Sequence, residues 1–260
     1  MDNNVKNLDI KTDTPEKKLY NLEIGKVQNK IDPNNIDLNK YEQKLNEILE
    51  KSQTQREKVT NSAIFLATIF PKIPYLLDRT SGHDGASLKG LNWVKDIVDT
   101  YDKTTDSHHT KNRTLDCSGF VSWTWVNSGL TIPITEATEK SRGSIGCTWD
   151  YENLIGKENE EPITSKNIIK NTKPGDFAYM KGHIGIIIEV NKKTSELVIA
   201  HSSENSQGMG ITTISTITGK VTKDDARTCE TDRIGKTYFE TVLHPSYKDD
   251  EIYEKLMIQK

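Results

Sequence analysis

The spacing of hydrophobic residues along the chain changes from helical to strand-like near residue 173. Before that point the pattern predicts helices over residues 38–48, 59–70, 88–101 and 116–130. In the first of these, Asp37 fits the N-cap and the apolar residues form a single stripe: Leu38, Tyr41, Leu45 and Ile48. We expect this helix to dock on the main domain. In the last, Asp116 fits the N-cap and Gly129 the C-terminal cap.

After a turn at 173–176, the pattern alternates with the period of strands. Strands are predicted over 177–181, 183–190, 196–201, 211–217 and 237–243. The connection at 191–194 is short enough for a hairpin, whereas residues 131–172 have no clean period. Helices come first and antiparallel strands follow, so the order predicts an α+β fold and not alternating βαβ units.

Composition divides the chain in two. Residues 1–57 are rich in Asn, Lys, Asp and Glu, which predicts a polar, partly helical arm. Residues 58–260 are predicted to form the main domain, with a polar insertion at about 78–114. The 35 basic and 38 acidic residues give a net charge of -3, which argues against a nucleic-acid binder. The apolar runs are too short to span a membrane, and the first residues do not resemble a signal peptide.

The three cysteines are too few and too far apart for a disulfide framework or a zinc site. Cys147 and Cys229 can pair with each other and leave Cys117 unpaired; the sequence leaves that question open. The insertion contains His83, His108 and His109, but their spacing does not match a zinc motif. Solvated loop histidines are the simpler interpretation, so we expect no metal and no cofactor.

Cys117 is placed to be reactive. If Asp116 caps the helix, Cys117 lies in its first turn, where unpaired backbone N–H groups and the helix dipole favour a thiolate. Its own N–H is then available to hold an oxyanion, and Gly119 leaves space beside the sulfur. The alternative is an ordinary buried cysteine, which is common.

The predicted strand 183–190 begins with His183, which is a candidate base for the Cys117 thiol. A period of two puts His183 on the same face as Gly185, and a glycine within a strand indicates that another backbone comes close. We expect the helix carrying Cys117 to lie there. His201, at the end of the next strand, is placed to orient the imidazole of His183; Glu204 and Asn205 are alternatives for this role.

These motifs together resemble the NlpC/P60 peptidases. The resemblance is carried by Asp-Cys-Ser-Gly-Phe-Val at 116–121, Pro-Gly-Asp at 174–176 before His-Ile-Gly-Ile at 183–186, and His-Ser-Ser-x-x-Ser-x-Gly at 201–208. It implies a papain-like fold in which a helix bearing Cys117 packs on an antiparallel sheet. It also implies a catalytic triad of Cys117, His183 and His201.

The resemblance further implies cleavage of bacterial cell-wall stem peptides between D-glutamate and a diamino acid, through a thioester acyl-enzyme. Asp116 and Ser118 match positions that hold the amino end of the stem peptide. Tyr75 matches a tyrosine that lines the site, although here Leu76-Leu77 follows it where the family has a Gly-Gly turn.

Two alternatives remain at the level of sequence. One is an amidase or acyltransferase on the same fold, and the other is a non-catalytic structural module of a particle. The protein is expected to act at the bacterial cell wall, delivered by a phage tail, by lysis as an endolysin, or by a conjugation assembly, with residues 1–57 as the docking arm.

Overall fold

The computed structural model describes residues 36–72, 88–94, 101–102, 107–108, 115–134, 146–203, 208–224 and 233–250. Its helices are α2 (Leu38–Lys51), α3 (Gln55–Ile64), η1 (Phe65–Ile69), α5 (Cys117–Asn127), α7 (Thr148–Ile155), η3 (Lys157–Asn159) and α8 (Ile168–Asn171). Its strands are β1 (Tyr101–Asp102), β2 (Ser107–His108), β3 (Glu160–Pro162), β4 (Phe177–Met180), β5 (His183–Asn191), β6 (Glu196–Ser203), β7 (Gly208–Ser215), β8 (Val221–Asp224) and β9 (Thr241–Leu243).

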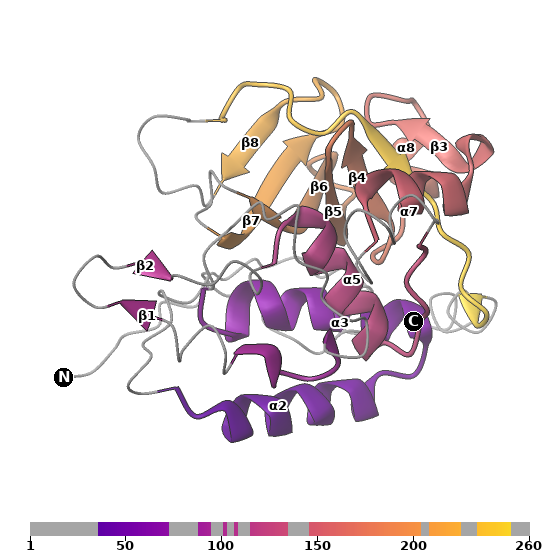
Figure 1. The fold of residues 1–260 in the computed structure, drawn as a ribbon. Coiled ribbons are helices and arrows are strands. Elements are labelled where there is room, and N and C mark those ends of the chain that lie inside the picture. The colour runs from indigo at the N-terminus through magenta and orange to yellow at the C-terminus, as the bar shows by residue number, and fades with distance from the viewer. Residues whose placement is uncertain are drawn as a thin grey trace.

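An antiparallel sheet of seven strands, in the order β3-β9-β4-β5-β6-β7-β8, forms one side of the molecule. Helices α3 and α5 pack against it, and α2 packs on α3 from outside (Figure 1). One apolar cluster fills the space between sheet and helices, and a second lies on the opposite face of the sheet. The predicted α+β arrangement is confirmed.

The N-terminal helices are held by their caps and by one apolar stripe. Asp37 caps α2, and Leu45 and Ile48 of α2 are buried in the helix-side cluster, as expected for a docking helix. Thr54 and Glu57 form a capping box that starts α3 four residues before the predicted helix. Helix α3 therefore crosses the boundary placed between residues 57 and 58, and the division into arm and domain stays a prediction.

Helix α5 has the predicted ends. The Asp116 carboxylate accepts a hydrogen bond from the Gly119 N–H, and Ser128 is the C-cap. Gly129 follows with φ +80°, and the N–H of Leu130 donates to the Trp125 carbonyl at 3.0 Å. This glycine-dependent turn ends the helix. All residues from Cys117 to Trp125 are buried, since the helix lies between the sheet and α3.

Strand β5 is buried on both faces. Ile184, Ile186 and Ile188 face the helices, and Ile187 faces the second cluster. The period of two would also place Val190 on the helix side, but it belongs to the second cluster. A bulge between Ile187 and Glu189 adds a residue to the strand and reverses the faces after it.

Two further predictions need correction at their ends. The predicted helix over 88–101 does not extend to Tyr101, which pairs with His108 in the short β1–β2 sheet. The last strand, predicted from 237, begins at Thr241 because the preceding residues make isolated bridges and loop contacts instead. Within the described residues, no helix is long and apolar enough to cross a bilayer.

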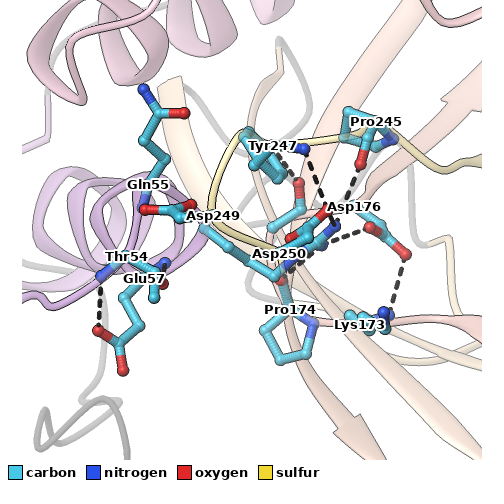
Figure 2. A network of polar contacts seen from close by, with 12 residues as sticks. Thr54, Gln55, Glu57, Lys173, Pro174, Asp176, Pro245, Tyr247, Asp249 and Asp250 are labelled. Atoms are coloured by element: carbon cyan, nitrogen blue, oxygen red, sulfur yellow. Dashed lines mark hydrogen bonds and ion pairs between the residues drawn. The ribbon is translucent and has the colours of Figure 1, made fainter. Parts of the chain in front are cut away.

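A buried arginine joins α3 to two distant segments. Arg56 donates to Asp176 from Nη1 at 2.6 Å and to Asp250 from Nε at 2.7 Å. Its Nη1 and Nη2 also donate to the carbonyl oxygens of Pro174 and Pro245, each at 3.1 Å. Figure 2 shows Pro174, Asp176, Pro245 and Asp250 gathered in this network beside the start of α3. The contact explains why an aspartate follows the Pro-Gly turn.

Candidate active site

Cys117 occupies the first position of α5 and is buried. Its Sγ lies 3.8 Å from the carbonyl oxygen of Gly182, the residue before His183. Behind it, the hydroxyl of Ser202 donates to the Leu115 carbonyl at 2.6 Å and ties strand β6 to the start of the helix. The thiol is thus held at a helix N-terminus, beside the first residue of β5.

His183 and His201 are in direct contact. The Nε2 of His183 lies 3.0 Å from the Nδ1 of His201, and the two rings meet edge to face. His183 begins β5 and His201 lies near the end of β6, so the hairpin between these strands brings the rings together. The structure therefore places the two histidines side by side, as the sequence predicted.

Glycines lie on both strands that flank His201. Gly210 of β7 is its partner in the register. A Cβ built on Gly185 of β5 would lie 2.9 Å from the His201 Cβ and 2.7 Å from the Cγ2 of Ile199. Gly185 therefore accommodates strand β6, and not the Cys117 helix, which the strand pattern had placed there.

The sequence did not reveal the groups that surround the two imidazoles. Tyr238 Oη lies 3.2 Å from the Nε2 of His183, and Phe239 packs against the same ring at 5.2 Å between centroids. The guanidinium of Arg233 lies 4.2 Å above the ring of Tyr238. These residues belong to an irregular segment before β9, so no periodic pattern marks them.

Burial and a nearby cation keep both histidines neutral. Burial, reinforced by the charge of Arg233, lowers the pKa of His183 to about 3. Burial also lowers the pKa of His201 well below its usual value, helped by the neighbouring imidazole of His183 and by the charges of Arg233 and Lys72. At neutral pH each ring therefore carries one proton and can accept another.

Asp116 and Ser118 flank the thiol. The hydroxyl of Ser118 donates to Asp116 Oδ1 at 2.8 Å, the same oxygen that caps the helix. Tyr75, together with Glu204 and Asn205, lies outside the described residues. Within the described ranges, no group of three His, Cys, Asp or Glu side chains is arranged to hold a metal ion.

Comparison with protein families matches residues 104–226 to the NlpC/P60 family. The chain carries an NlpC/P60 domain. The matched segment contains Cys117, His183 and His201, and it ends just before Arg233 and Tyr238. A search of the curated proteins and a search of the solved structures each found no match.

The helix-on-sheet arrangement is the α+β architecture expected of an NlpC/P60 domain. The match to this family indicates a hydrolase of the cysteine peptidase or amidase type that acts on peptidoglycan.

Acid should destabilise the NlpC/P60 domain, because its two buried histidines resist protonation. In the unfolded chain His183 binds a proton near pH 6.5, but in the folded state only near pH 3. Between these values the unfolded state binds more protons, so the free energy of unfolding decreases as the pH is lowered. For His183 the loss is about 1.4 kcal/mol per unit below 6.5, or about 2 kcal/mol at pH 5; His201 acts in the same direction.

Urea unfolding at pH 7.5, 6 and 5 measures this loss. The variant His183→Gln lacks the titrating group, so its stability should decline less steeply over the same range. Equal slopes for the two proteins would show that His183 does not resist protonation.

Proposed function

We propose that this protein is a peptidoglycan endopeptidase that cleaves stem peptides between D-glutamate and a diamino acid. Cys117 is the nucleophile, His183 the general base and acid, and His201 the residue that orients His183. One observation carries the proposal: a cysteine at a helix N-terminus lies against the strand whose first residue is an imidazole, and a second imidazole 3.0 Å away holds that ring.

In the proposed reaction, His183 takes the proton of Cys117 and the sulfur attacks the carbonyl carbon of the amide. The N–H of Cys117, at the N-terminal end of α5, is assigned as a donor to the oxyanion. The C–N bond then breaks, and the proton on His183 passes to the leaving amine. Water attacks the thioester with His183 again as base, which releases the acid and regenerates the thiol.

The amino end of the stem peptide is assigned to Asp116 and Ser118. A carboxylate beside the nucleophile matches an ammonium group in charge. Asp116 Oδ1 is engaged by Ser118 and by the Gly119 N–H, so the carboxylate is held in one orientation. Tyr75 completes this proposed binding region on the basis of the family resemblance alone.

Mass spectrometry of the products from a defined muropeptide tests the bond assignment. The endopeptidase should produce a new amino group on the diamino acid and a new carboxyl group on D-glutamate. Free lactyl groups would instead identify an amidase, and a new acyl linkage to an added amine an acyltransferase. An unchanged muropeptide, with the fold intact, would favour the non-catalytic module.

Delivery by a phage particle, as an endolysin or by a conjugation assembly remains part of the proposal. Residues 36–57 include α2 and the start of α3, which pack into the domain. The docking role therefore falls to residues 1–35, and deleting them tests it without removing any described element.

A further inference from the structure

A chain of hydrogen bonds continues from His201 away from the thiol. The Nε2 of His201 lies 2.8 Å from Thr212 Oγ1, and Thr212 lies 3.0 Å from Asp224 Oδ1. Asp224 receives two hydrogen bonds from Arg233, one from Nε and one from Nη2. The side chains of this Arg–Asp pair are only 5% and 3% exposed, so water competes little for them.

The chain fixes which nitrogen of His201 carries the proton. Asp224, paired with Arg233, accepts as a carboxylate, so the single hydroxyl hydrogen of Thr212 is donated to it. Thr212 then has only lone pairs to offer His201, and its partner nitrogen Nε2 must be the donor. A neutral imidazole has one N–H, so Nδ1 of His201 is an acceptor.

The same reasoning extends to His183. Because Nδ1 of His201 accepts, the Nε2 of His183 must donate to it. Within the described residues, His183 makes its two hydrogen bonds, to His201 and Tyr238, through this one nitrogen. Its Nδ1 therefore carries the lone pair. The neutral state that this requires agrees with the burial of both rings and the nearby charge of Arg233.

We propose that Thr212, Asp224 and Arg233 are positioning residues that fix the tautomers of His201 and His183, so that Nδ1 of His183 is the atom that takes the Cys117 proton. The effect on catalysis rests on the proposed function. The positions of the protons do not, because they follow from counting hydrogen-bond donors and acceptors.

If Thr212, Asp224 and Arg233 had only a structural role, replacing them would have a different effect. If these residues only tie β7 and β8 to the segment at 233, their loss would lower stability and leave the tautomers unchanged. A positioning role changes the tautomer of His201 and lowers kcat, whereas KM stays within about twofold, because the proposal assigns none of the three to substrate binding.

The test compares Thr212→Val, which keeps the shape and removes the hydroxyl, with Thr212→Ser, which keeps the hydroxyl. Thr213→Val is the matched control, since Thr213 is the next residue of β7 and lies outside the chain of hydrogen bonds. Nitrogen-15 NMR of the imidazoles reports which nitrogen is protonated, with signals assigned from His183→Gln and His201→Gln. Turnover of a defined muropeptide gives kcat and KM.

We expect wild type, Thr212→Ser and Thr213→Val to show Nε2–H on both rings. Thr212→Val should lose the single tautomer at His201, with kcat about 10–100-fold lower. This is less than the roughly 10⁴-fold loss seen when the group that fixes a catalytic histidine is itself altered. If Thr212→Val does not fold, Asp224→Asn removes the acceptor charge and should show the same two changes.

Protonation of Nδ1 of His201 in the wild type would overturn the inference, and so would wild-type tautomers and kcat in a folded Thr212→Val. These outcomes are separable from failure of the proposed function. An inactive wild type with Nε2–H tautomers would remove the endopeptidase assignment and retain the proton positions. An active wild type with the other tautomer would do the reverse.

Discussion

Replacing Cys117 with alanine should reduce muropeptide hydrolysis by about 10⁴-fold or more, because the reaction has no other route to the thioester. The change removes one sulfur atom at the first position of α5, where the cap is formed by Asp116 and not by the thiol. We therefore expect the circular dichroism spectrum to be retained and stability to change by about 1 kcal/mol. Product release followed by liquid chromatography measures the loss.

Cys147→Ala is the matched control. Cys147 is also buried and also lies at the start of a helix, α7, but it is not part of the proposed triad. This variant should hydrolyse the muropeptide at close to the wild-type rate, and iodoacetamide should inactivate it through Cys117. Substantial hydrolysis by Cys117→Ala would remove Cys117 as the nucleophile.

Replacing Arg56 with methionine should lower the free energy of unfolding by about 3–5 kcal/mol, as expected when one partner of a buried ion pair is removed. The side chain of Asp176 is 2% exposed, so removal of the guanidinium would leave its carboxyl group buried without this partner. Burial lowers the pKa of Arg56, but the charges of Asp176 and Asp250 raise it by more than burial lowers it. The guanidinium therefore remains a cation. Its stacking on Tyr247, 4.7 Å from the ring centroid, would also be lost.

Urea unfolding with Lys44→Met as control measures this difference. Lys44 and its partner Glu47 on α2 are 48% and 43% exposed, and such surface pairs contribute at most about 1 kcal/mol. Losses of similar size in the two variants would show that the Arg56 network is not a buried anchor.

The elements predicted well are those fixed by neighbouring residues. Asp116 and Gly129 mark the two ends of α5, and Asn191 caps the turn that joins β5 to β6 by accepting from two backbone N–H groups. Local capping and alternation decide such features, so the sequence contains them. Helix α7 and strands β3 and β8 had no such signal, since they are short and depend on the sheet they join.

The residues of the candidate site also divide into those that local sequence patterns predict and those that they do not. The contact between His183 and His201 followed from a hairpin and was predictable. The ring of Tyr238 and the Arg233–Asp224 pair reach the histidines from segments with no regular period. Thr212 had a weak signal, because it follows Gly210 by two residues on the strand face that carries His201. Buried ion pairs between distant segments leave no pattern in either one.

Arg56 also sets a limit on when the domain can close during synthesis. Its partner Asp250 is 194 residues further along the chain. At about 5–20 residues per second, the ribosome needs roughly 10–40 s to add that stretch. Until then α3 has its guanidinium but not Asp250, so the N-terminal helices lack this part of their anchor until Asp250 has been synthesised.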